Sequence, residues 1–169
     1  VYCNDRELAS GSTYSTGSSF NYAPYGRLDT NKTPTYNCAN IKDAFSGSNS
    51  EAKLTYPIGL MTSDEISYAG GKNGTVLPSP YAWYYLNSAG GSITGSTYWW
   101  TLSPRRWGGS DSSVWFVDGP GYPGRLSNGV VGSSFALRPS VSLKSCTKWS
   151  SGDGSSSNPY TIQETETGC

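Results

Sequence analysis

Apolar and polar residues alternate along the second half of the chain with the two-residue period of a β-strand. Between residues 113 and 118 the pattern places Val114, Phe116 and Asp118 on one face, and Trp115 and Val117 on the other. Comparable stretches cover residues 98–103, 125–131 and 135–143. Segments rich in Gly and Pro separate them, and residues 119–124 are typical of a turn. The pattern predicts an antiparallel meander, in which Pro104 ends the first strand and Pro139 marks a bulge or an edge.

The first half of the chain shows weaker periodicity and more turn-forming residues. Residues 1–40 are rich in Ser, Gly and Tyr, with alternation at residues 20–22 that predicts a short strand. One helical turn is expected at residues 40–45 and a strand at residues 54–60. Near the C-terminus, residues 150–158 indicate a loop and residues 159–162 a closing strand.

The sequence predicts that a helix begins after residue 61. Thr62 is followed three residues later by Glu65, which is the pattern of a capping box. Ile66 and Ala69 would face inward, and the Gly70-Gly71 pair would end the helix. After a loop at 72–80, residues 81–87 predict a second short helix that stops at residues 90–91. Together these elements predict an α+β fold with one or two short helices on short antiparallel strands and much irregular backbone.

Charge and composition limit the classes of partner that the chain can bind. Charged residues make up 14% of the chain and the formal net charge is zero, so nucleic acid and anionic membranes are disfavoured as partners. The chain contains no run of about 20 apolar residues, so direct insertion into a membrane is not expected. Six Trp and thirteen Tyr supply apolar area in place of aliphatic side chains. The chain starts at Val1 without a Met, which is typical of a mature or trimmed piece of a longer protein.

The chain contains four widely spaced cysteines: Cys3, Cys38, Cys146 and Cys169. No two are close enough in sequence for a CxxC metal or redox motif. In a chain this polar they predict two disulfides formed in an oxidising compartment, and therefore a secreted or cell-surface location. Three pairings are possible, and we favour the two local ones, Cys3–Cys38 and Cys146–Cys169, since each would hold a chain end.

Catalysis finds little support in the residue types. Histidine is absent, which excludes Ser-His-Asp and Cys-His catalysis and His-based zinc sites. Asp64 and Glu65 offer a carboxylate pair for a glycosidase, although adjacent helical residues do not face each other and Glu65 also fits the helix cap. Weak calcium candidates are Asp111 with Asp118, and Asp153 with nearby Asn158, where turn chemistry is the simpler interpretation. No cofactor is therefore predicted.

Several motifs occur in a familiar order. Trp99-Trp100-Thr101-Leu102-Ser103-Pro104, then Val114-Trp115-Phe116-Val117, then Ala136-Leu137-Arg138-Pro139-Ser140-Val141 follow one another along the chain. This set resembles bacterial C-type-lectin-fold surface domains, including gut-bacterial surface proteins and variable proteins diversified by retroelements. The match covers residues 54–162. It implies a single lectin-like domain over 1–169, with an irregular extension at 1–50 clamped by a disulfide, a core at 51–162 and a tail at 163–169.

The resemblance also implies a ligand surface between the Trp-Ser-Pro-like strand and the Arg-Pro strand, at residues 105–134 of this chain. The candidate contacts are Arg105, Arg106, Trp107, Asp111, Trp115, Asp118, Tyr122, Arg125 and Asn128. Trp107 lies in a segment without a strand or helix pattern, so both an exposed contact and a tucked anchor are open for it. The calcium-binding triplets of sugar-binding animal lectins are absent, which disfavours calcium-dependent sugar binding.

Three functions remain open. The first is a non-enzymatic binding module, an adhesin or display domain of a secreted or cell-surface bacterial or phage protein, whose partner is a protein or glycan on another cell or host surface. The second is a structural pilus, stalk or surface-layer subunit without its own ligand. The third is a glycan-acting enzyme, which needs two carboxylates about 5–10 Å apart in a cleft. Tyr- and Trp-rich loops with Ser, Gly and Asn favour the first.

Overall fold

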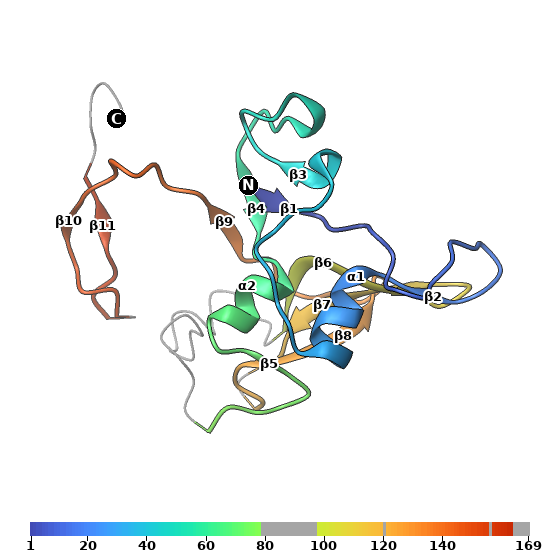
Figure 1. Cartoon of the computed structure of the whole chain (residues 1–169). Helices are drawn as coiled ribbons and strands as arrows, with labels where there is room; N and C mark the ends of the chain where they lie inside the picture. Colours follow the sequence, from blue (N-terminus) through green and yellow to red (C-terminus); the bar gives the residue numbers. More distant parts are fainter. Residues whose placement is uncertain (79–97, 120, 156, 164–169) are drawn as a thin grey trace.

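A five-stranded sheet forms the centre of the molecule. The computed structural model describes residues 1–78, 98–119, 121–155 and 157–163 (Figure 1). The strands lie in the order β2 (Phe20–Asn21), β6 (Trp99–Trp107), β7 (Ser112–Val117), β8 (Arg125–Val130) and β5 (Lys72–Asn73). Neighbours are antiparallel except β5 and β8, which run parallel. The predicted meander over residues 98–131 is confirmed, and the α+β class with it.

Three two-stranded sheets surround the central one. They pair β1 (Tyr2–Cys3) with β3 (Ala44–Phe45), β4 (Ile58–Leu60) with β9 (Pro139–Val141), and β10 (Trp149–Ser151) with β11 (Thr161–Ile162). Figure 1 shows β10 and β11 as a hairpin that projects away from the other elements. The strand expected at 159–162 therefore pairs only with β10 and does not close the central sheet.

The helix α2 (Ser63–Tyr68) begins as its sequence predicts. The Thr62 hydroxyl accepts the Glu65 backbone N–H at 3.1 Å, and the Glu65 carboxylate accepts the Thr62 N–H at 2.7 Å. This capping box satisfies two backbone donors at once, and Ile66 is buried beneath the helix. The other helical segments are short: α1 (Ala23–Tyr25), η1 (Gly26–Asn31), η2 (Ile41–Asp43) and η3 (Ser50–Ala52). The second helix expected at 81–87 lies outside the described residues.

The core lies on the face of the sheet that α2 and η1 cover. It consists of six buried residues: Leu28, Ile66, Trp99, Trp115, Val117 and Leu126. Trp115 and Val117 share this face, as their alternation predicts. On the opposite face Trp100 and Phe116 pack with Phe135, at ring-centroid distances of 4.5 and 4.7 Å from it. The adjacent Trp99 and Trp100 thus serve two separate clusters.

Pro104 acts differently from the prediction, whereas Pro139 lies in an edge strand, as predicted. Pro104 does not end β6, which continues to Trp107, because Pro104 pairs with Val114 at a register shift where no ladder N–H is required. Pro139 begins β9, so the strand expected at 135–143 is only three residues long. The strand expected at 54–60 is likewise reduced to β4.

The remaining short elements agree with the sequence only in part. The predicted strand at residues 20–22 is confirmed as β2. The helical turn at 40–45 is η2, after which Ala44 and Phe45 form β3. The expected loop at 72–80 contains the two-residue strand β5, which adds to the far edge of the sheet.

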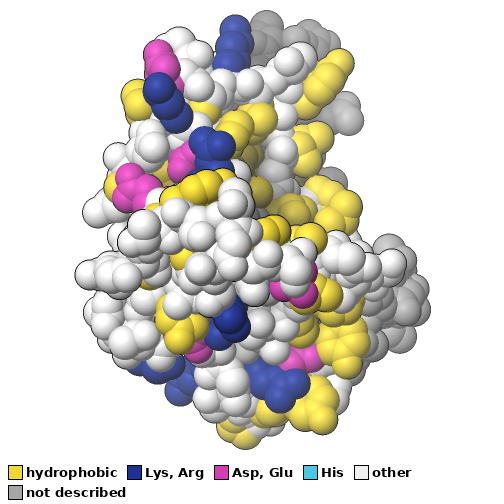
Figure 2. All heavy atoms as spheres, turned by 90° about the vertical axis from the view of Figure 1, so that its right-hand side faces the viewer, with side chains coloured by type: hydrophobic (Ala, Val, Ile, Leu, Met, Phe, Trp, Pro, Cys, Tyr) yellow, Lys and Arg dark blue, Asp and Glu magenta, His cyan; other side chains and the backbone are white. Residues whose placement is uncertain are grey.

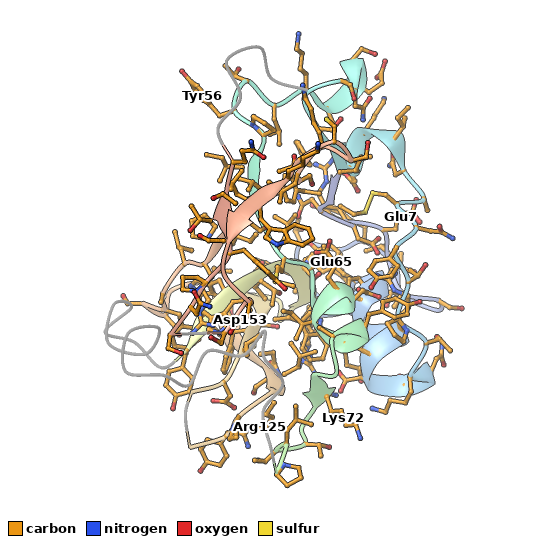
Figure 3. The ribbon with its side chains drawn as sticks, turned by 90° about the vertical axis from the view of Figure 1, so that its left-hand side faces the viewer. Glu7, Tyr56, Glu65, Lys72, Arg125 and Asp153 are labelled. Carbon is orange, nitrogen blue, oxygen red and sulfur yellow. A yellow bond between two sulfur atoms is a disulfide. The ribbon has the colours of Figure 1, made fainter. Side chains whose placement is uncertain are left out.

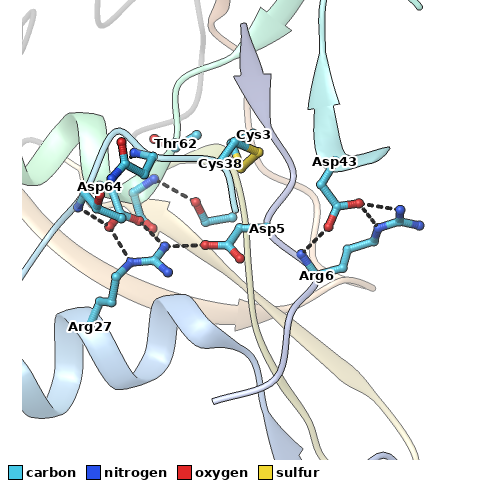
Figure 4. Close-up of polar contacts among 12 residues, drawn as sticks. Cys3, Asp5, Arg6, Arg27, Cys38, Asp43, Thr62 and Asp64 are labelled. Carbon is cyan, nitrogen blue, oxygen red and sulfur yellow. Dashed lines mark hydrogen bonds and ion pairs between the residues drawn. A yellow bond between two sulfur atoms is a disulfide. The ribbon is translucent and has the colours of Figure 1, made fainter. Parts of the chain in front are cut away.

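The N-terminal segment is fastened covalently. A disulfide joins Cys3 and Cys38, as the local pairing predicts (Figure 4). Cys146 is also disulfide-bonded, and its expected partner Cys169 lies outside the described residues. These bonds indicate an oxidising environment. No helix within the described ranges is long and apolar enough to cross a membrane.

Candidate ligand-binding surface

The nine predicted ligand contacts do not lie on one surface. Trp107 and Asp111 flank the turn between β6 and β7, whereas Asp118, Tyr122 and Arg125 belong to the turn between β7 and β8. The six residues of β7 separate these turns by about 20 Å. Figure 3 shows Arg125 at the same end of the molecule as Lys72 and away from Glu7.

Arg105 is held inside the fold. Its guanidinium donates to the Asp29 carboxylate at 2.8 and 3.2 Å and to the Asn128 side-chain oxygen at 3.3 Å. It also lies over the rings of Tyr25 and Trp115, at 4.9 and 5.3 Å from their centroids. Trp115 is 0% exposed. Arg105 and Trp115 therefore join the sheet to α1 and η1. Trp115 is buried and Arg105 is largely buried, while Asn128 stays exposed beside them.

The turn between β7 and β8 is fixed by a buried ion pair. Asp118 is buried and accepts the Arg125 Nε at 2.5 Å. The Arg125 guanidinium lies 3.9 Å from the centroid of the Tyr122 ring. Two of the three predicted contacts at this end thus stabilise the turn, and Tyr122 is the one whose side chain remains exposed.

Trp107 belongs to a strand and not to a free loop. It pairs with Phe20 of β2, and the residue is half-buried. Its buried indole Nε1 has no hydrogen-bond partner within the described part of the chain. The expectation of an unpatterned loop here was wrong because β2 supplies an edge partner that lies 87 positions earlier. Arg106 and Asp111 remain exposed on either side of it.

A second loop lies beside the turn between β6 and β7. Residues 10–19, mostly Ser, Gly and Thr around Tyr14, lead into β2. A Cβ built on Gly109 would lie 3.9 Å from the Gly17 carbonyl oxygen, so the two loops touch. We call residues 10–19 and 107–112 the paired-loop end. Figure 2 shows this side as largely uncharged polar surface with scattered charged groups and hydrophobic side chains.

Three aromatic rings support the paired-loop end. Tyr14 packs on Phe20 at a centroid distance of 5.1 Å, and Phe20 meets Tyr22 edge-on at 5.4 Å. Phe20 is buried, whereas Tyr14 is 71% exposed. Burial, and then Tyr14, raises the pKa of the Tyr22 phenol, and nearby Arg6 opposes that rise. Tyr22 is therefore partly desolvated and lies near Tyr14, which itself remains exposed.

An open groove of about 660 Å³ adjoins these rings. Its lining residues are Arg6, Glu7, Leu8, Tyr14, Tyr22, Asn40 and Asp43. Arg6 donates from Nε to Asp43 at 2.6 Å and from its backbone N–H at 3.0 Å (Figure 4). Asp43 is buried by this contact, which anchors the floor of the groove to η2.

The groove was not predicted from the sequence. Its residues come from the segment interpreted as an irregular extension, and the resemblance covers only residues 54–162. The available signal was compositional, because Tyr14, Phe20 and Tyr22 lie within a Ser- and Gly-rich stretch. Such a mixture is typical of binding loops, where rigid rings and adaptable polar groups combine.

The carboxylates considered for catalysis have structural partners. Asp64 is buried and accepts Arg27 Nε at 2.8 Å and the Thr35 N–H at 2.9 Å. Arg27 also contacts Asp5 at 2.5 Å (Figure 4). Burial of the guanidinium lowers the pKa of Arg27, but the carboxylates of Asp64 and Asp5 outweigh burial, so the pKa of Arg27 is raised. Glu65 is used in the helix cap, which leaves neither member of the predicted pair free.

The calcium candidates are dispersed. Asp111 and Asp118 lie at opposite ends of β7. Hydrogen bonds from the Ser155 hydroxyl and backbone N–H, and then from the Asn158 side chain, lower the pKa of the exposed Asp153, which indicates a self-contained turn. Among the described residues, no three His, Cys, Asp or Glu side chains gather as a metal site would require.

The chain matches no known family model, no curated protein and no solved structure. The resemblance to C-type-lectin-fold surface domains therefore stays a prediction.

Proposed function

We propose that this chain is a ligand-binding display domain of a secreted or cell-surface bacterial or phage protein, and that it binds a protein or glycan through the paired-loop end and the adjoining groove. The observation that carries the proposal is the gathering of an exposed Tyr ring, two Ser- and Gly-rich loops and an open groove at one end of a braced sheet. The proposed surface keeps Arg106, Trp107 and Asp111 of the predicted contacts and adds Tyr14 and its neighbours.

Rigid support favours this interpretation. The base of the first loop is paired to β6 through β2, and the Cys3–Cys38 disulfide ties the segment before it to the region around residue 38. A binding site built on rigid elements loses less conformational entropy when a ligand binds. The loops themselves are left free of the core, which separates stability from recognition.

A C-type-lectin-like fold is part of the proposal. The mixed α+β architecture, the short capped helix α2 and the irregular connections are consistent with that fold. Diversification by a retroelement follows only from the sequence resemblance. It would require variable codons at exposed positions. Arg106 and Asp111 are exposed, whereas Trp115 is buried.

A structural subunit is the second candidate, and one observation favours it. The β10–β11 hairpin carries three exposed large side chains, Trp149, Tyr160 and Ile162. A two-stranded hairpin is marginally stable alone, and exposed apolar side chains of this kind often mark contact surfaces. This candidate predicts self-association that is lost in Trp149→Ala. An enzyme is disfavoured because Asp64 and Glu65 are committed to Arg27 and to the helix cap.

The test uses the whole chain on arrays of extracellular proteins and of glycans. We expect Arg106→Ala with Asp111→Ala to reduce binding of any captured ligand by about tenfold, since these exposed side chains flank the loop tip. Tyr122→Ala, an exposed side chain at the other end of β7, is the matched control and should bind as the parent does. Equal binding by all three proteins, or loss only in Tyr122→Ala, would place the site elsewhere.

A further inference from the structure

We infer that the groove lined by Arg6, Glu7, Tyr14, Tyr22 and Asn40 binds a neutral glycan, independently of calcium. The inference rests on the proposed binding function and names the ligand class of one part of that surface. Three features of the groove support it: its size, its aromatic wall, and the balance of its polar groups.

The groove has the dimensions of a small-ligand site. Its volume of about 660 Å³ falls within the range of 300–1,000 Å³ that is typical of such sites. The groove is open to solvent, as a site for a short chain of sugar rings must be. A flat protein epitope would make little use of such a recess, whereas a short oligosaccharide would fill it.

One wall of the groove is aromatic and is held in place before binding. Tyr14 is exposed but rests on buried Phe20, which in turn packs against Tyr22. The C–H faces of a pyranose ring carry partial positive charge and pack on the negative face of an aromatic ring. A ring supported from behind loses little freedom on binding, so most of this contact is kept as affinity.

The polar groups of the groove match hydroxyls. The Asn40 side-chain oxygen accepts the Lys42 N–H at 3.0 Å, which leaves the two N–H donors of its amide for a ligand. The Glu7 carboxylate is exposed and accepts only. Sugar hydroxyls both donate and accept, so they satisfy these groups together, as an apolar ligand would not.

The charges of the groove disfavour anionic ligands. Asp43 neutralises Arg6 on the groove floor, and no cation among the described residues forms an ion pair with Glu7. The Glu7 carboxylate would therefore repel an anionic sugar. The groove therefore favours a neutral polyhydroxylated molecule over sialylated or sulfated ones.

The experiment presents the full chain, with EDTA, to an array of neutral, sialylated and sulfated glycans and bacterial polysaccharides. We expect neutral glycans to bind. Tyr14→Ala should weaken the best of them at least about tenfold, and Tyr14→Phe should keep the affinity within about threefold, because the ring face is retained. Tyr56→Ala is the matched control: Tyr56 is 77% exposed and points into solvent away from Glu7 (Figure 3). Unchanged thermal midpoints verify that the variants fold.

The inference is overturned if no neutral glycan binds, if only acidic glycans bind, or if Tyr14→Ala binds as tightly as Tyr56→Ala. A protein array separates this failure from failure of the proposed function. A protein ligand that is lost on Arg106→Ala with Asp111→Ala, together with no glycan binding, would refute the glycan and leave the binding function intact. No binding on either the glycan array or the protein array would refute both the glycan inference and the proposed binding function.

Discussion

Removal of the N-terminal disulfide gives the sharpest stability prediction. The Cys3–Cys38 bond closes a loop with a sequence separation of 35 residues, which contains β2, α1 and η1. On the chain-entropy account, closing such a loop destabilises the unfolded state by about 4 kcal/mol at 25 °C. The double variant Cys3→Ala with Cys38→Ala leaves no unpaired thiol at either position. Its free energy of unfolding should be lower than that of the parent by about 4 kcal/mol.

Urea unfolding followed by Trp fluorescence measures this loss, since buried Trp99 and Trp115 report on the core. A thermal midpoint lower by about 10 °C should accompany it for a chain of this size. A loss below about 1 kcal/mol, with an unchanged dependence on urea, would contradict the reasoning. It would mean that the N-terminal segment is held by its ion pairs without help from the disulfide.

Three further predictions concern burial, backbone and ionisation. Trp115→Ala should cost about 3–5 kcal/mol in urea unfolding, while Trp149→Ala, at a position 64% exposed, should change stability by less than about 0.5 kcal/mol; similar costs would refute the assignment of the core. Gly124→Ala should lower the free energy of unfolding by at least about 1–2 kcal/mol, because φ at Gly124 is +68° and an added Cβ would also overlap the Leu77 side chain. Gly121→Ala places its Cβ in open space and should be near neutral in the same assay. Burial raises the pKa of Tyr22 in the folded protein, so the stability contributed by Tyr22 is full below pH 10 and is lost as pH rises through the folded pKa. Tyr22→Phe should therefore flatten the alkaline decline in the thermal midpoint. An identical decline in the variant and the parent would contradict this expectation.

Local patterns predicted much of the fold. The Thr62 to Glu65 capping box and the alternation through Trp115 and Val117 both depend on neighbours within a few residues, and both are confirmed. Pro104 shows where local rules fail. A proline predicts the end of a strand unless the pairing shifts register at that point, and the shift is decided by the neighbouring strand β7.

The candidate site depends on contacts that are distant in sequence. Arg105 is of a residue type that is common in surface contacts, yet it donates a hydrogen bond to Asp29, 76 positions earlier, and packs within the fold. Arg6 and Asp43, 37 positions apart, form the floor of the groove. Periodicity and composition carry no information about such pairs, so the sequence predicted residues typical of binding and placed several of them on the wrong surface.

The most direct measurement is hydrogen–deuterium exchange of the whole chain, free and saturated with its tightest ligand from the arrays. We expect ligand binding to slow exchange at residues 6–22 and 105–112 and to leave the β10–β11 hairpin and the turn around Tyr122 unchanged. Protection confined to the hairpin or to that turn, with the paired-loop end exchanging as in the free protein, would contradict it.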